Sequence, residues 1–169
     1  MVNVVDEKVN PIDHHVQMSG GELVFRLLGA FRELVDAMHD ELARRGHPDV
    51  RPVHGFALQA IAAGPVTGSA VAARLGVTKQ AAGKTLDGLV ERGYAERTGD
   101  PGDARRRLVV LTPRGREVLA ISADVLERCR ARWADQVGPD RFAALEAALR
   151  TMTDGGAGPL AAAGWFASS

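Results

Sequence analysis

The chain has 169 residues, the length of one domain with short extensions. Apolar residues make up 46% of it and charged residues 25%, which is typical of a soluble globular protein with a buried core. No run approaches the roughly 20 apolar residues of a membrane helix, and the N-terminus lacks the pattern of a secretory signal. The single cysteine, Cys129, excludes an internal disulfide. We therefore expect a cytoplasmic protein with no membrane partner.

The formal net charge is zero, but the charges are unevenly distributed along the chain. Residues 1–50 hold five Lys or Arg against nine Asp or Glu, whereas residues 51–112 hold nine against five. Residues 113–169 hold seven of each. A basic middle segment on an otherwise acidic or neutral chain is typical of a module that binds a polyanion.

The first half of the chain is predicted to be helical. Residues 1–19 show no clean periodicity and are expected to form an arm. Apolar residues then recur every three to four positions from Gly20 to Arg45, which predicts a long helix. After a connection at 47–53, three short helical patterns follow at 54–64, 68–75 and 79–93, each ended by a glycine. Thr67 and Thr78 are placed to cap the second and third of these helices.

Two strands are predicted next, on either side of a turn. The segments YAERT (94–98) and RRLVVLT (106–112) flank a turn from Gly99 to Gly102. Thr112 and Pro113 begin a long helix over 113–135, and a last helix covers 139–153. The tail 154–169 is rich in glycine. The predicted fold class is mainly α with a small β-hairpin (α+β).

The stretch VAARLGVTKQAAGKTLDGLVERGY (71–94) has the spacing of a helix-turn-helix. Gly76 permits the positive φ of the tight turn. The residues predicted to face the core are Val71, Leu75, Val77, Ala81, Leu86, Leu89 and Val90. The residues predicted on the slim outer face are Thr78, Lys79, Gln80, Ala82, Gly83, Lys84 and Asp87. Lysine and glutamine can pair with guanine and adenine in the major groove, although a merely solvated helix face is the alternative.

The hairpin carries three consecutive arginines, Arg105, Arg106 and Arg107, shortly after Asp103. An arginine at such a tip suits the strong negative potential of a narrow minor groove. Strand alternation places Arg105 and Arg107 on one side, and we expect Asp103 to accept the guanidinium of Arg105 and fix its aim. Arg106 and Arg107 are then expected to contact phosphates or to form plain strand surface. The alternative is an ordinary surface hairpin whose arginines are solvated.

With these elements in this order, the chain resembles the MarR family of bacterial transcriptional regulators. The resemblance rests on AARLGVTKQAAGKTLDGLVERGY (72–94), DPGDARRRLVVLTPRG (100–115) and the flanking helices. It implies a winged helix-turn-helix lobe at 51–112, between dimerisation helices at 20–50 and 113–153. It also implies a homodimer that binds a pseudo-palindromic operator in double-stranded DNA, as a repressor relieved by a small, commonly aromatic, ligand. The DNA-binding residues that follow from it are Thr78, Lys79, Gln80, Lys84, Asp103, Arg105 and Arg107.

Three positions depart from the pattern of the family. Ala104 stands where many relatives have a second arginine. The wing is therefore expected to bind DNA less tightly than theirs. Gly83 and Gly88 are unusual and are expected to soften the recognition helix.

Other functions are less well supported by the residues. The chain has no nucleophile elbow, no phosphate-binding loop and no paired-cysteine metal site, so we expect neither an enzyme nor a bound cofactor. One alternative is a winged helix that binds protein. Another is a regulator that senses redox state through Cys129, or a metal through histidines that lack clear ligand spacing, namely His14, His15, His39, His47 and His54.

Overall fold

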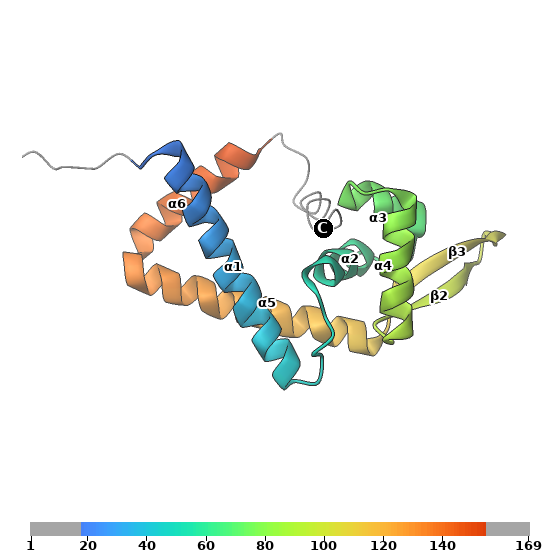
Figure 1. Cartoon of the computed structure of the whole chain (residues 1–169). Coiled ribbons are helices and arrows are strands. Elements are labelled where there is room, and N and C mark those ends of the chain that lie inside the picture. Colours follow the sequence, from blue (N-terminus) through green and yellow to red (C-terminus); the bar gives the residue numbers. More distant parts are fainter. Residues whose placement is uncertain (1–17, 155–169) are drawn as a thin grey trace, which may run out of the picture. The chain divides into compact units, whose positions relative to one another are not determined.

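The computed structural model describes residues 18–154 and has a mainly helical fold with a small antiparallel sheet (Figure 1). In chain order the elements are α1 (Gly20–Arg44), α2 (Pro52–Ala62), β1 (Val66–Thr67), α3 (Gly68–Leu75), α4 (Lys79–Glu91), β2 (Ala95–Asp100), β3 (Asp103–Leu111), α5 (Pro113–Val137) and α6 (Pro139–Thr153). The fold class expected from the sequence is confirmed. The expectations for residues 1–17 of the arm and 155–169 of the tail lie outside the described residues.

The chain divides into two compact units within α1, after Arg32. In the described part of the first unit, the Oγ of Ser19 accepts a hydrogen bond from the backbone N–H of Glu22 at 3.1 Å, which caps the start of the helix. The large apolar side chains of this part are exposed: Met18, Leu23, Val24, Phe25, Leu27, Leu28 and Phe31.

The sheet has three strands in the order β1-β3-β2, all antiparallel. The sequence predicted only two, because β1 has two residues and is too short to show periodicity. Val66 pairs with Val109, and Thr67 pairs with Leu108. The strands β2 and β3 are longer than predicted, so that the turn shrinks to Pro101 and Gly102, with an irregularity in register at Gly99 and Asp100.

The helices begin at capping residues or at proline. α2 begins at Pro52, two residues earlier than predicted, because proline has no N–H to leave unsatisfied in the first turn. Thr78 caps α4 as predicted, with its Oγ1 accepting from the backbone N–H of Ala81 at 3.1 Å. Thr112 caps α5, with its Oγ1 accepting from the N–H of Gly115 at 3.1 Å.

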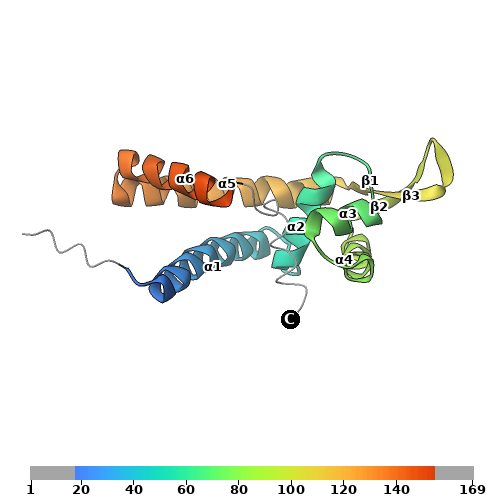
Figure 2. The ribbon, with the colours of Figure 1, turned by 90° about the horizontal axis from the view of Figure 1, so that it is seen from above.

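The core of the second unit lies between the end of α1, α2, α3, α4, the sheet and α5 as far as Cys129. One expectation about α4 is wrong: Ala82 is buried rather than on the outer face, while Ala81 and Val90 are half-buried. Positions 82, 86 and 89 share one side of a helix, so Ala82 packs inward with Leu86 and Leu89. α6 folds back beside α5 (Figure 2), where Arg130 forms an ion pair with Glu146 at 3.3 Å.

Candidate nucleic-acid interface

The turn between α3 and α4 has the geometry of a helix-turn-helix. Gly76 ends α3 in the left-handed conformation, with φ of 65°. Its backbone N–H donates to the carbonyl of Ala73, and the N–H of Val77 donates to the carbonyl of Ala72 at 3.1 Å. The next helix therefore starts at a fixed angle to α3, three residues after Gly76, at Lys79.

This geometry leaves one face of α4 open to solvent. Thr78, Lys79, Gln80 and Lys84 are all exposed, as the sequence predicted. Ala82, Leu86 and Leu89 are buried on the opposite side, which anchors the helix to the lobe. The exposed face therefore presents two ammonium groups, an amide and the first backbone N–H groups of the helix.

The hairpin of β2 and β3 extends away from the helices of the lobe (Figure 1). At its tip, Asp100 accepts from the backbone N–H of Gly102, and Asp103 accepts from the backbone N–H of Arg105, both at 2.9 Å. The expectation that Asp103 holds the guanidinium of Arg105 is therefore replaced by a bond to the backbone. The guanidinium of Arg106 lies 4.0 Å from the carboxylate of Asp100. Asp103 thus shapes the backbone before Arg105.

A hollow of about 590 Å³ lies between the wing, α4 and the start of α3. Lys79 and Gly83 line it from α4, and Arg106 and Arg107 line it from β3. The sequence assigned Arg106 no more than a phosphate contact or plain strand surface, but the structure places it beside the exposed start of the recognition helix. The hollow is basic because three arginines and a lysine line it, and its remaining lining residues are Thr67, Gly68, Ser69, Leu86, Arg97 and Val109.

Arg97 is a residue of this site that the sequence reasoning missed. It lies on β2, and its Nη2 is 2.5 Å from Oδ1 of Asp87 on α4. The pair connects the wing to the recognition helix across ten residues of sequence. Its only sign in the sequence is an arginine on an outward strand position, which does not identify a partner.

A second hollow, of about 470 Å³, lies on the other side of α4, next to the start of α2. Lys84 lines it together with Arg51 and Arg92. The face of α4 therefore lies between two surfaces that carry basic side chains. Such a distribution suits a helix flanked by two rows of phosphates.

The structure describes Cys129 and three of the five histidines, His39, His47 and His54, whereas His14 and His15 lie outside the described residues. Cys129 is buried, with 6% of its surface exposed, and the neighbouring Arg128 and Arg130 form ion pairs with Asp124 and Glu127. Between residues 18 and 154, no group of three His, Cys, Asp or Glu side chains could hold a metal ion. The same residues include no helix that is long and apolar enough to cross a membrane.

Comparisons with known proteins agree with this geometry. A model of the MarR family matches residues 49–106. The protein Rv2011c of Mycobacterium tuberculosis is 33% identical over 129 residues, which are 76% of this chain and 86% of that protein. The crystal structure of RV1404 from M. tuberculosis superposes with a TM-score of 0.68 at 28% identity, over 82% of this chain and 94% of that one. The structure of Streptococcus pneumoniae FabT in complex with DNA superposes with a TM-score of 0.67 at 22% identity, over 79% and 94%.

Proposed function

Because this chain belongs to the MarR family of winged-helix regulators, we propose that it is a transcriptional regulator that binds a specific sequence in double-stranded DNA. The observation that carries this proposal is the exposed polar face of α4 beside the basic hollow that it shares with the wing. A second hollow on its other side is lined by Lys84, Arg51 and Arg92, together with the carboxylates of Asp87 and Glu91. The fold of a DNA-bound neighbour, FabT, supports it. A regulator of this kind acts where the chromosome lies, in the cytoplasm.

In this proposal α4 enters the major groove. Gln80 pairs with an adenine edge, and Lys79 and Lys84 donate to guanine or to phosphates. The backbone N–H groups that follow Thr78 donate hydrogen bonds to a phosphate at the helix N-terminus. Gly83 and its lack of a side chain allow a close approach to the groove floor.

The wing lies over the backbone and enters the adjacent minor groove. Arg105 is placed nearest the tip and inserts where an A·T-rich sequence narrows the groove. Asp103 supports it by holding its backbone N–H, and Arg107 contacts phosphate from the strand that lines the basic hollow. These side chains contribute mainly to the affinity for DNA, while α4 provides most of the base preference.

The protein acts as a homodimer. Large apolar side chains are exposed on the first turns of α1, including Phe25 at 74%, and on α6, including Met152 at 68%. Single exposed apolar residues are ordinary, but several on one helix indicate a surface that a second copy covers. Two copies related by a two-fold axis place their recognition helices about 34–36 Å apart, one turn of DNA.

The protein represses transcription, and a small aromatic acid relieves the repression. A hollow of about 390 Å³ lies between the end of α2, β3 and the start of α5. Its walls are aliphatic, from Ile61, Val110 and Leu119, and Arg116 lies among them with one N–H donated to the carbonyl of Leu111 at 2.8 Å. The remaining N–H groups of this guanidinium suit a carboxylate. A ligand here would press on β3 and so displace the wing.

The test is DNA binding by the purified protein to sequences selected from a random pool, followed by fluorescence anisotropy at several salt concentrations. We expect enrichment of a pseudo-palindrome and a linear fall of log affinity with log salt. Gln80→Ala should relax the preference at one position in each half-site. Arg105→Ala should weaken binding most at A·T-rich flanks.

A matched control is Arg141→Ala, which removes an exposed arginine on α6 that none of the proposed contacts uses. It should bind DNA like the wild type. A protein that enriches no sequence and forms no salt-sensitive complex would refute the proposal. An equal loss for Gln80→Ala on every sequence would assign this residue to a phosphate.

A further inference from the structure

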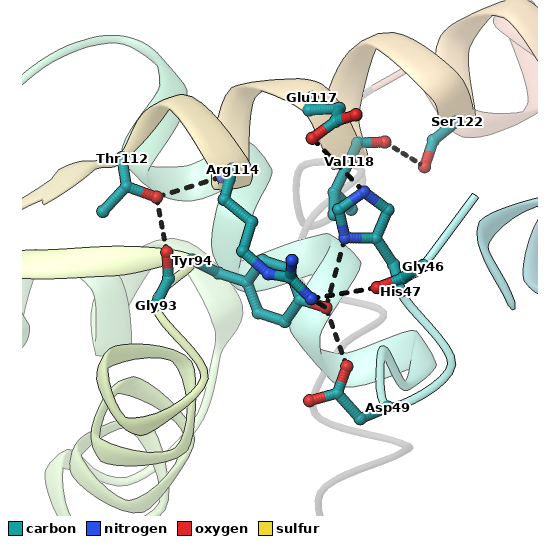
Figure 3. A network of polar contacts seen from close by, with 11 residues as sticks. Gly46, His47, Asp49, Gly93, Tyr94, Thr112, Arg114, Glu117, Val118 and Ser122 are labelled. Atoms are coloured by element: carbon teal, nitrogen blue, oxygen red, sulfur yellow. Dashed lines mark hydrogen bonds and ion pairs between the residues drawn. The ribbon is translucent and has the colours of Figure 1, made fainter.

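A cluster of polar side chains around the hydroxyl of Tyr94 has no part in the proposed DNA contacts. Tyr94 lies just after α4 and just before β2, and its side chain is fully buried, with 0% exposed. Its hydroxyl oxygen is 2.7 Å from Oδ1 of Asp49, 3.3 Å from Nδ1 of His47 and 3.3 Å from Nη2 of Arg114 (Figure 3). Three side chains from outside the recognition helix and the wing therefore meet at one atom.

The hydrogen-bonding capacity of this hydroxyl is fully used. A phenol has one proton to donate and two lone pairs to accept with. Because the Asp49 carboxylate can only accept, Tyr94 donates to it and accepts from Arg114 and from the Nδ1–H of His47. Burial raises the pKa of the Tyr94 hydroxyl, and the bond to Asp49 raises it further, against the opposing effect of Arg114. The hydroxyl therefore keeps the proton that it donates.

Asp49 connects this hydroxyl to the end of α4. Its second carboxylate oxygen, Oδ2, is 3.1 Å from Nε of Arg92, the residue that ends α4. The Nη1 of Arg92 in turn donates to the carbonyl of Gly88 inside the same helix at 2.8 Å. Burial acts to raise the pKa of Asp49, but the Tyr94 hydrogen bond, a backbone N–H, Arg92 and Arg114 together lower it. One carboxylate thus holds both Arg92, the C-cap of α4, and Tyr94, two residues further along the chain.

On the opposite side, the same hydroxyl is connected to α5. Arg114 lies in the first turn of α5, where its Nη2 also donates to the carbonyl of Gly46 at 2.9 Å. Its guanidinium carbon lies 4.9 Å from the centre of the Tyr94 ring, within the range of a cation–π contact. His47 also lies beside α5, where its Nε2 is 3.5 Å from Oε2 of Glu117 without a hydrogen bond between them. The end of α4, the connection 46–49 and the start of α5 are therefore joined around Tyr94.

We propose that the hydroxyl of Tyr94 is a positioning group that fixes the angle of α4 and the wing relative to α5, and with it the half-site spacing that the dimer accepts. The proposal rests on the proposed function, because it needs DNA binding by a homodimer whose subunits meet through α1 and α6, and α6 packs beside α5. Tyr94 itself does not touch DNA. It acts through the orientation of the residues that do.

The aromatic ring and the hydroxyl of Tyr94 can be separated by substitution. Tyr94→Phe keeps the ring, its packing and its contact with the Arg114 guanidinium, and removes only the three directed hydrogen bonds. Half-sites moved apart by one base pair are rotated by about 34° and shifted by about 3.4 Å, so a rigid dimer rejects them. A dimer with a looser angle between α4 and α5 accepts them more readily. The ratio of the affinities for the selected and the altered spacing therefore reports how firmly the angle between α4 and α5 is held. It does not depend on the strength of the individual DNA contacts, because these are the same in both operators.

The experiment compares an operator selected by the wild-type protein with versions whose centre is one base pair longer or shorter, using fluorescence anisotropy on the full-length dimer. The wild type should prefer the selected spacing by about tenfold or more, the scale of one mismatched base pair. Tyr94→Phe should reduce this preference to about two- to threefold, with an unchanged dependence on salt. Asp49→Asn keeps an acceptor for the hydroxyl but loses the charge that holds Arg92. Its preference for the selected spacing should lie between that of the wild type and that of Tyr94→Phe.

The control is Val125→Ala, which removes buried apolar surface from α5 and makes none of these bonds. It should lower the melting temperature and keep the wild-type preference. A Tyr94→Phe dimer that keeps the wild-type preference within about twofold, or a Val125→Ala dimer that relaxes it equally, overturns the proposal. If Tyr94→Phe does not fold, Asp49→Ala takes its place, because this side chain is 40% exposed. A wild type that selects no operator refutes the proposed function instead.

Discussion

A Cβ atom on Gly115 would lie 2.0 Å from the carbonyl oxygen of Tyr94. The first turn of α5 is therefore in direct contact with the backbone that joins the recognition helix to the wing. Thr112 strengthens this contact, because its N–H donates to the same carbonyl at 3.2 Å and its hydroxyl donates to the carbonyl of Gly93 at 2.6 Å. No side chain fits between the two segments at position 115.

Gly115→Ala should therefore be strongly destabilising. The methyl group meets backbone atoms, which cannot rotate away, so we expect a loss of about 1–3 kcal/mol in the free energy of unfolding, as for overpacked cores. Urea unfolding followed by circular dichroism measures it. A variant as stable as the wild type would show that α5 can move away from Tyr94 at little cost.

Gly83→Ala should have the opposite effect on stability. A Cβ at position 83 meets no other atom within 4 Å, and alanine is the better helix former by about 0.5–1 kcal/mol. We expect a higher free energy of unfolding together with weaker binding to the selected operator, because the added methyl group lies in the hollow beside Lys79. Unfolding and anisotropy measurements on the same preparation test both. Unchanged or stronger DNA binding would contradict the role of a slim helix face.

His54 should make the protein less stable at mildly acidic pH. Burial lowers the pKa of His54, Arg92 and Arg51 lower it further, and Asp49 opposes them. The neutral ring is needed because its Nδ1 accepts from the backbone N–H of Arg51 at 3.2 Å. Since the unfolded chain has the ordinary value of 6.5, its histidine takes up a proton first as the pH falls below that value. The contribution of His54 to the free energy of unfolding is therefore fully present above pH 6.5 and decreases as the pH falls below that value.

The measurement for this prediction is the free energy of unfolding between pH 8 and pH 5. His54→Gln retains an acceptor and does not titrate, so its stability should fall less steeply with pH than that of the wild type. Some slope should remain, because burial also lowers the pKa of His39, against Asp36 and Asp40. Equal slopes in the two proteins would exclude His54 as a cause.

The ion pair between Arg97 and Asp87 should contribute little to stability. Both side chains are about half exposed, at 47% and 55%, so a double-mutant cycle with alanine should give a coupling of about 0.2–1 kcal/mol that decreases with salt. The same cycle measured on DNA affinity should show a positive coupling, because the pair connects the wing to α4. Strictly additive effects of the two substitutions on DNA affinity would mean that wing and helix act independently.

Local patterns in the sequence predicted most of the fold. Thr67 and Thr78 cap helices as predicted, and a helix starts at Thr112 and Pro113 as predicted, because a threonine before a helical pattern accepts from the nearest backbone N–H groups. The exposure of Lys79, Gln80 and Lys84 followed from helical periodicity. What could not be predicted depends on contacts between distant segments. β1 exists only because Val66 and Thr67 meet β3, and Tyr94 meets Asp49 across 45 residues.

Errors at the site have equally specific reasons. The small size of Ala82 favours the outer face, which must fit a groove, but its position relative to Leu86 and Leu89 decides that it is buried. Asp103 was expected to hold a guanidinium, and it holds a backbone N–H instead, because an aspartate near a tight turn bonds most easily to the N–H two residues ahead. The roles of Thr78, Lys79, Gln80, Lys84, Asp103, Arg105 and Arg107 toward DNA stay predictions.

Thr67 belongs to two elements at once. As the last residue of β1 it pairs with Leu108 of β3, and as the cap of α3 its Oγ1 accepts from the N–H of Ala70 at 3.2 Å. A force applied to the arginine tip of the hairpin is therefore transmitted along β3 into the first helix of the helix-turn-helix. We therefore expect distorted DNA that displaces the tip to displace α3 as well. The hairpin and α3 are thus expected to move together. A duplex whose shape does not fit the wing would then also fit the helix-turn-helix poorly.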